Sequence, residues 1–284
     1  MEENENNSAV TRAGLPLKKD VLIRAGFPLK GGPGSGNFDH PGNSPNVGGS
    51  GEGGGSEKPE TYHDYKDADK AFTKWAAEQD KTDTTKDYEG VVNSYTGKSY
   101  AAINDSLRGD KEALYDELGR RFNLEPVGGW REGQREETLD KFAKQTENDA
   151  KMLREAVNNG PQYEGTVYRG TWTSDGDLAE KLSTGNGEIT INGMVSTSSD
   201  SKILDTYTNK DVAAYRPDQI YEVRYTIENA RGAAVQGLTD YQVKKMGLDE
   251  VLLDSGHTYE IKSANTTRNS DGSIQRIDTR VRMK

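Results

Sequence analysis

The sequence predicts an α+β fold in which a helical part packs on a mixed or antiparallel β-rich core, behind a disordered tail. Three observations predict it. Apolar residues recur at helical spacing between residues 66 and 157. From residue 165 to residue 281 the pattern changes to short runs that alternate apolar and polar residues. Helices followed by strands are typical of α+β domains, whereas a doubly wound parallel sheet alternates the two.

Residues 1–60 are expected to form a flexible tail and linker. Between residues 31 and 56, 11 of 26 residues are glycine, so the segment buries too little side chain to offset its ordering entropy. Before it, RAGLPLK at 12–18 is echoed by RAGFPLK at 24–30. Two copies are too few for a solenoid, so we interpret them as duplicated binding motifs or a local duplication. The remainder, 61–284, is expected to form one domain, with a helical part at about 61–160 and a β-rich core at about 161–284.

Five helices are predicted in the first half, at 66–79, 86–94, 99–108, 110–122 and 136–157. The first places Ala68, Ala71, Phe72 and Trp75 at helical spacing. The third ends in Arg108 and Gly109, an order that suits a left-handed C-cap.

Strands are predicted in the second half because these runs alternate in polarity and are bounded by Gly, Asn and Asp. They lie at 165–169, 193–198, 219–227, 232–236, 249–253, 259–264 and 274–281. Short helices are expected at 177–182 and 200–207.

Composition limits the classes of function. The chain of 284 residues has no cysteine and only three histidines, which excludes thiolate nucleophiles and a Cys/His zinc site, and we expect no metal. A formal net charge of −10 argues against a nucleic-acid partner bound through its phosphates. The sequence has no apolar run of roughly 18 residues and no signal-peptide pattern, so a soluble protein without membrane insertion is expected. With 31% hydrophobic residues, the core must be concentrated in part of the chain.

Three strand motifs stand in a specific order. Arg169 and Gly170 end the first strand, Ser196 and Thr197 lie within Met-Val-Ser-Thr-Ser, and Glu250 opens Val-Leu-Leu. This order resembles the Arg-Ser-Glu class of mono-ADP-ribosyltransferases, the clostridial binary-toxin and exoenzyme group. The helix Tyr-x-x-Ile-Asn-x-x-x-Leu-Arg-Gly at 100–109 resembles the segment that precedes those motifs in the same family. The resemblance covers roughly residues 62–284, and it implies a β-sandwich core of ADP-ribosyltransferase type.

Each motif also has a structural interpretation. An arginine after a strand is usually a surface ion pair, Ser-Thr-Ser is common in strands, and the Asn-Leu-Arg helix can be simply a capped helix. Four motifs in the family's order, on the predicted element types, indicate function more strongly than any one alone.

The resemblance assigns roles in the cleavage of the nicotinamide–ribose bond of NAD. Glu250 would face the ribose and the positive charge that develops on it, and Ser196 would orient Glu250. Arg169 would hold the phosphate end of NAD, because a planar guanidinium can grip two oxygens. The other positions implied in binding NAD are the Gly170 backbone, Thr197 as support of its strand, and Asn104 and Arg108 on the helical side.

One position departs from the family. Members that modify arginine carry Glu two residues before the catalytic Glu, and here that position is Leu248. Asp249 is adjacent, but successive strand residues point to opposite faces, so it is not expected to replace the missing group. In the preceding loop, Tyr241 either touches the acceptor or packs on the sheet. We therefore assign Tyr241 and Leu248 to substrate recognition.

The sequence thus predicts an NAD-dependent mono-ADP-ribosyltransferase with NAD as co-substrate and a macromolecular acceptor, expected to be a protein. Two alternatives stay open: an NAD glycohydrolase, favoured by Leu248, and a virion structural protein with a degenerate transferase domain. The glycine-rich tract resembles tracts of phage head-associated proteins, which implies a phage-head or toxin-particle partner for the tail. The expected location is the host cytoplasm, a virion, or outside the cell by a non-classical route.

Overall fold

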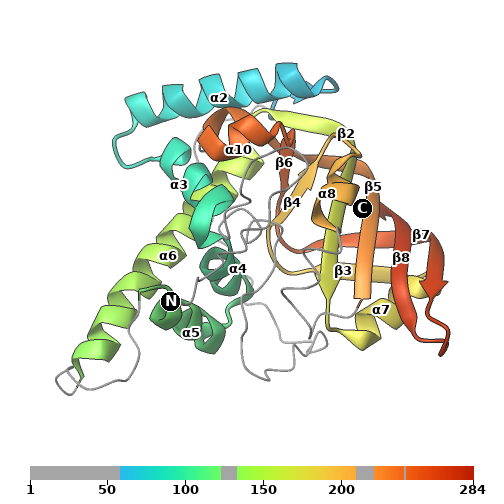
Figure 1. Cartoon of the computed structure of the whole chain (residues 1–284). Helices are drawn as coiled ribbons and strands as arrows, with labels where there is room; N and C mark the ends of the chain where they lie inside the picture. The colour runs from blue at the N-terminus through green and yellow to red at the C-terminus, as the bar shows by residue number, and fades with distance from the viewer. Residues whose placement is uncertain (1–57, 123–132, 209–220, 240) are drawn as a thin grey trace, which may run out of the picture.

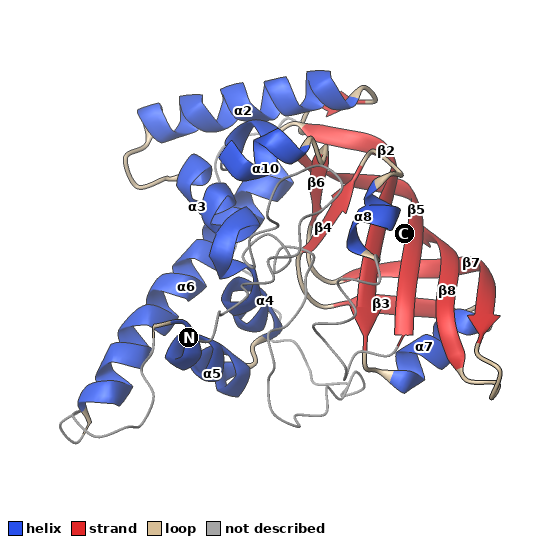
Figure 2. Ribbon diagram, viewed as in Figure 1, coloured by secondary structure: helices blue, strands red, loops and turns tan. Residues whose placement is uncertain are grey.

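The computed structural model describes residues 58–122, 133–208, 221–239 and 241–284. Within them, helices gather on one side of the molecule and an eight-stranded sheet on the other (Figures 1 and 2). The α+β class predicted from the sequence is confirmed. The predicted tail lies almost wholly outside the described residues, so the boundary at residue 60 stays a prediction.

The helical side contains the five predicted helices, with bounds shifted by a few residues. They are α2 (Tyr65–Thr82), α3 (Tyr88–Ser94), α4 (Tyr100–Arg108), α5 (Lys111–Arg121) and α6 (Gln134–Asn159). Aspartate side chains cap three of their N-termini by accepting hydrogen bonds from backbone N–H groups. These residues are Asp64, Asp87 and Asp110. Gly109 adopts a left-handed φ of 71° at the end of α4, which confirms the predicted C-cap.

A short π-helix joins α3 to α4 at Tyr95–Ser99, where the sequence predicted a break. Gly97 has non-helical dihedrals of φ −94° and ψ −114° inside it. Gly97 therefore forms a kink at which the chain changes direction between two helical segments.

The sheet has the strand order β1-β2-β4-β6-β5-β8-β7-β3. Its pairings are antiparallel except for β1 with β2 and β5 with β8, so the sheet is mixed as predicted. Because β2 also pairs with β5, the strands β2, β4, β6 and β5 close into a ring. The strands are β1 (Thr61–Tyr62), β2 (Gln162–Thr173), β3 (Glu188–Ile191), β4 (Val195–Ser198), β5 (Tyr221–Ala234), β6 (Glu250–Leu253), β7 (His257–Arg268) and β8 (Ile274–Met283).

Strand β5 differs from the prediction, because the two expected strands at 219–227 and 232–236 are one. Asn229 lies at its bend with a φ of 55°, a conformation that asparagine adopts more readily than most residues. The strand pairs with β2 on both sides of Asn229, with β8 before it and with β6 after it.

Further elements depart from expectation. The short edge strands β1 and β3 were not predicted, and α10 (Tyr241–Met246) is a helix where a recognition loop was expected. The expected short helices are present as α7 (Gly176–Ser183) and α8 (Ile203–Tyr207).

Strand β6 separates two hydrophobic cores. Val251 and Leu253 belong to the core formed by the sheet and α7, whereas Leu252 belongs to the core formed with α2, α3, α4 and α6. The face of β6 that bears Leu252 is thus the face that meets the helices. No helix in the described ranges is long and apolar enough to span a membrane.

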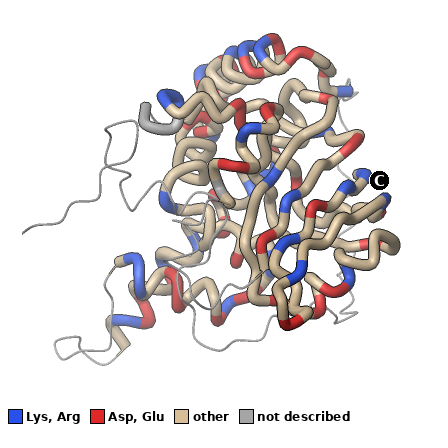
Figure 3. The backbone as a smooth tube through the Cα atoms, turned by 45° about the vertical axis from the view of Figure 1, so that its right-hand side comes forward, with Lys and Arg blue, Asp and Glu red and all other residues tan. Residues whose placement is uncertain are grey.

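Lys and Arg positions are interspersed with Asp and Glu positions along the backbone of the described chain (Figure 3). On β8, Arg276 pairs with Asp278, and Arg280 and Arg282 both pair with Glu228 of β5. The arginines of this strand are therefore largely compensated by nearby carboxylates.

Candidate active site

Arg169 is positioned by β2 and points toward β4. Its Nη1 donates a hydrogen bond of 2.6 Å to the backbone oxygen of Ser196. In the register of β2 with β5, Arg169 lies opposite Tyr225, whose ring is buried in the core between the sheet and α7. The half-buried guanidinium is therefore fixed between two strands rather than extended into solvent.

Ser196 and Glu250 share one face of the β4–β6 pair. The register places Ser196 opposite Leu252 and Ser198 opposite Glu250. Because alternate residues of a strand lie on one face, these four residues form one surface. Leu252 packs in the helical core, so this surface faces the helices.

Glu250 is 8% exposed and begins β6. Its backbone oxygen accepts hydrogen bonds from the N–H of Val235 (3.0 Å) and from the hydroxyl of Tyr65 (3.2 Å). The backbone of Glu250 is thus held by the residue that follows β5 and by the first residue of α2.

The hydroxyl of Tyr95 lies where these groups meet. It donates to the backbone oxygen of Met194 (2.9 Å) and accepts from Nδ2 of Asn104 (3.3 Å). Burial raises the pKa of Tyr95, whereas Asn104, Arg169 and Ser196 oppose the rise. The negative charge of Glu250 adds to the rise in this pKa. The charges of Arg169 and Glu250 and the hydroxyl of Ser196 thus all influence the pKa of this one buried hydroxyl.

Tyr95 was missed by the sequence analysis. It lies just before the segment that begins at Tyr100, and only the helical spacing of Val91, Val92 and Tyr95 marks it as a buried position.

Asn104 joins α4 to the start of β4. Its Oδ1 accepts from the N–H of Met194 (2.8 Å), and its Nδ2 also lies 3.3 Å from the oxygen of the same residue. Gly193 permits this approach, because a Cβ there would lie 3.2 Å from Oδ1 of Asn104 and 3.3 Å from Nη1 of Arg108. Arg108 forms an ion pair with Asp105. Both predicted helical residues thus border the strand of Ser196.

Thr197 and Gly170 make structural contacts. Oγ1 of Thr197 donates to the backbone oxygen of Val251 (2.7 Å), a contact that links β4 to β6. Gly170 faces α8: a Cβ there would lie 2.9 Å from Cγ2 of Thr208 and 3.1 Å from the oxygen of Leu204. Glycine is required here by helix packing, and contact of its backbone with nicotinamide stays a prediction.

Asp249 was expected to lie within the strand of Glu250, but β6 begins at Glu250 and not at 249. Asp249 has a left-handed φ of 46°, so strand alternation does not set the direction of its side chain. Burial and the neighbouring Asp200 raise its pKa, and Lys66 opposes the rise. A carboxyl group thus precedes Glu250 in a conformation that the sequence did not reveal.

The two residues assigned to substrate recognition are placed differently. Leu248 packs with the partly buried Tyr168, Trp172 and Leu204 around Ile203 of α8. Tyr241 is the first residue of α10, and its side chain lies outside the part that the structure describes.

Comparison with known structures identifies the fold. The chain is similar to the ADP-ribosyltransferase Vis in complex with agmatine, with 18% identity, a TM-score of 0.50, and coverage of 78% of this chain and 84% of Vis. Vis in complex with the inhibitor M6 gives 19% identity, a TM-score of 0.50, and coverage of 78% and 83%. A third structure of Vis, a toxin from Vibrio splendidus, gives 17% identity over 80% of this chain and 88% of Vis, with a TM-score of 0.49. No protein-family description and no curated protein matches the sequence. The described chain therefore has the α+β fold of ADP-ribosyltransferases.

Proposed function

We propose that this protein is an NAD-dependent mono-ADP-ribosyltransferase that cleaves the nicotinamide–ribose bond and transfers ADP-ribose to a macromolecular acceptor. One observation carries the proposal: Arg169 donates a hydrogen bond to the backbone of Ser196, and Ser196 shares one face of the β4–β6 pair with Glu250. The fold is consistent with the same activity.

The convergent groups suit the chemistry of NAD cleavage. Arg169 supplies a fixed positive charge and planar donors for a phosphate of NAD. Glu250 supplies a negative group for the positive charge that develops on the ribose as nicotinamide leaves. Both groups are held by strands, so little reorganisation is needed when the substrate binds.

Asn104 and Tyr95 contribute from the helical side. Their hydrogen bonds with Met194 hold α4 against the strand of Ser196. In the proposal they form the wall of the NAD site, and Arg108 borders it at its outer end, where its side chain is 43% exposed.

The acceptor is proposed to be a protein. Vis was crystallised with agmatine, a small guanidinium compound, which makes arginine side chains the first acceptors to test. Leu248 occupies the position two residues before Glu250, and its apolar side chain packs against α8. The second carboxylate of arginine-modifying enzymes is therefore absent at that position. This absence keeps NAD glycohydrolase, with water as the acceptor, as the second candidate.

The expected phage-head or toxin-particle partner stays a prediction, because the tail that would bind it lies outside the described residues. A virion protein with an inactive transferase domain is distinguished by the same activity assay.

The test is incubation of the full-length chain with labelled NAD and cell extract, followed by detection of labelled protein and free nicotinamide. We expect both. Free nicotinamide without labelled macromolecule would favour the glycohydrolase, and neither product would overturn both enzymatic functions.

Arg169→Lys provides a specific variant for that assay, with Arg231→Lys, an exposed residue of β5, as its matched control. Lysine keeps the charge but loses the paired donors, so we expect the KM for NAD to rise on the order of tenfold for Arg169→Lys. Equal KM values for the two variants would contradict the role assigned to Arg169.

A further inference from the structure

Helix α8 touches the chain segments that carry all three predicted catalytic residues. It follows β4 through a tight turn, in which the N–H of Asp200 donates to Oγ of Ser198 (2.9 Å) and the N–H of Ile203 donates to the oxygen of Asp200 (3.2 Å). The position of α8 is therefore coupled to the strand of Ser196.

The same helix lies directly on β2 beside Arg169. Gly170 leaves room for Leu204 and Thr208, and Oγ1 of Thr208 closes the end of the helix on the oxygen of Leu204 (2.5 Å). Side chains alternate along β2, so α8 covers one face of this strand while Arg169 occupies the other. A shift of α8 would therefore not displace the guanidinium of Arg169 by direct contact.

Leu248 connects α8 to the strand of Glu250. Its side chain packs with Ile203 and Leu204, and Ile203 is 7% exposed. The N–H of Ser199 donates to the oxygen of Asp249 (3.1 Å), which ties the two chain segments at the level of Glu250. The position of residues 248–249, which lead into β6 at Glu250, therefore depends on the position of α8.

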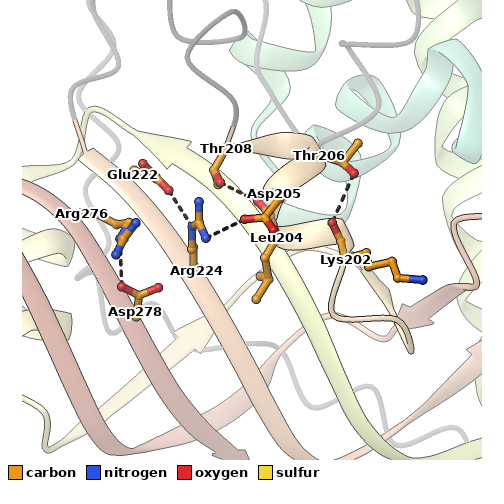
Figure 4. Close-up of polar contacts among 9 residues, drawn as sticks. All are labelled: Lys202, Leu204, Asp205, Thr206, Thr208, Glu222, Arg224, Arg276 and Asp278. Carbon is orange, nitrogen blue, oxygen red and sulfur yellow. Dashed lines mark hydrogen bonds and ion pairs between the residues drawn. The ribbon is translucent and has the colours of Figure 1, made fainter. Parts of the chain in front are cut away.

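Ion pairs add a second attachment on the outer face of the sheet (Figure 4). Arg224, the register partner of Gly170, donates to Glu222 (2.6 Å) and to Asp205 of α8 (2.9 Å). The Asp205 side chain is 83% exposed, and exposed pairs contribute little to stability. The apolar contact of Ile203 with Leu248 is therefore the main attachment.

From these contacts we propose that α8 sets the position of Glu250 relative to Arg169, with Ile203 and Leu248 as positioning residues. The inference rests on the proposed transferase function and deepens it. Leu248 then serves to hold the catalytic strand rather than to contact the acceptor.

The arrangement determines which kinetic constant changes. Arg169 lies on the opposite face of β2 and keeps its bond to Ser196, so binding of the phosphate end of NAD is preserved when α8 loosens. Glu250 acts on charge that develops only as the bond breaks, so its displacement lowers kcat and leaves KM nearly unchanged.

The experiment compares Ile203→Ala with Ile189→Ala in the full-length chain. Ile189 is 5% exposed and lies on the edge strand β3, so its truncation is a matched loss of buried side chain away from α8. With nicotinamide release as the assay, we expect Ile203→Ala to lower kcat on the order of tenfold with KM within about threefold. Ile189→Ala should keep kcat within about twofold for the folded fraction.

Asp205→Asn provides a graded variant, because it leaves Arg224 paired with Glu222. We expect no more than about a fivefold fall in kcat, the limit set by an exposed ion pair. A larger loss than that of Ile203→Ala would overturn the assignment of the apolar contact as the main attachment.

Amide hydrogen exchange tests the coupling without activity. Ile203→Ala should speed exchange at Ser199 and the β6 amides on the order of tenfold, and Ile189→Ala should not. Unchanged exchange, or equal kcat for the two isoleucine variants, would overturn the role of α8. Absence of nicotinamide release by the wild type would instead overturn the proposed function, and exchange would still decide the coupling.

Discussion

Arg169 lies among three buried tyrosines. Burial raises the pKa of Tyr95 and of Tyr259, and it raises the pKa of Tyr225 to about 12. In each case the positive charge of Arg169 opposes the rise. The three hydroxyls are thus neutral at physiological pH, so they place no negative charge beside the guanidinium that would compete with an anionic ligand.

Two of these tyrosines should respond oppositely to loss of the hydroxyl. The Tyr259 hydroxyl is buried without a hydrogen-bond partner among the described residues, whereas that of Tyr95 has two. We expect Tyr259→Phe to leave the free energy of unfolding unchanged or raise it by up to about 1 kcal/mol. Tyr95→Phe should lower it by about 1–3 kcal/mol, because Met194 and Asn104 lose a partner. Urea denaturation measures both, and an equal loss for the two variants would contradict this difference.

At this scale the sequence predicted Arg169, Ser196 and Glu250, because short motifs retain their order along the chain. Tyr95 could not be predicted, since its role arises from contacts that the segment after α3 makes with Met194, just before β4. The side-chain direction of Asp249 could not be predicted, because an aspartate in the sequence does not indicate that its backbone adopts a left-handed conformation just before a strand.

Among the elements, α4 and α5 each have one glycine whose replacement by alanine has a different effect. At one the backbone conformation is unfavourable for alanine, and at the other it is favourable. Gly109 ends α4 at φ 71° with no atom within 4 Å of an added Cβ. Gly119 lies inside α5, where an added Cβ would meet only the end of the Arg135 side chain at 3.3 Å.

The two alanine variants should therefore change stability in opposite directions. Gly109→Ala should lower the free energy of unfolding by about 1–2 kcal/mol, because alanine is strained at positive φ. Gly119→Ala should raise it by about 0.5–1 kcal/mol through helix propensity. Chemical denaturation decides between them, and a stabilising Gly109→Ala would contradict the cap.

The long periodic helices, the well-bounded strands and the short helices α7 and α8 were predictable, whereas β3 and α10 were not. Strand β3 has four residues and depends on pairing with β7, and α10 forms where glycine and threonine precede it. Such elements gain most of their stability from tertiary contacts, which a local pattern does not record.

In the whole molecule, β6 lies between two cores, and the candidate site lies at the same boundary. Leu252 packs toward the helices and Leu253 toward the sheet, so both cores position Glu250. Activity in this account depends on the helices and the sheet staying packed together.

The pH dependence of folding should report on His257 at the start of β7. Burial lowers its pKa below the ordinary value of 6.5, with Arg154 adding to the shift and Asp254 opposing it. As pH falls below about 6.5, the unfolded chain binds a proton that the folded chain resists, so stability is lost. The variant His257→Gln has no histidine at this position, so it should not show this loss of stability at low pH.

Urea denaturation at pH values between about 7.5 and 5.5 provides the comparison, since it spans the unperturbed histidine pKa. The free energy of unfolding of His257→Gln minus that of wild type should become more positive as pH falls. A difference that stays constant with pH would contradict the burial of His257 as the cause.

The most direct test of the central claim is the rate of nicotinamide release from NAD by wild type and by Glu250→Gln, with Glu164→Gln on the exposed side of β2 as control. We expect wild type and Glu164→Gln to release nicotinamide at similar rates. Glu250→Gln should be slower by about 10²-fold or more, with KM nearly unchanged, because the amide cannot stabilise the developing positive charge. Equal rates for Glu250→Gln and wild type, or no release by wild type, would contradict the assignment of Glu250 and of this site to NAD cleavage.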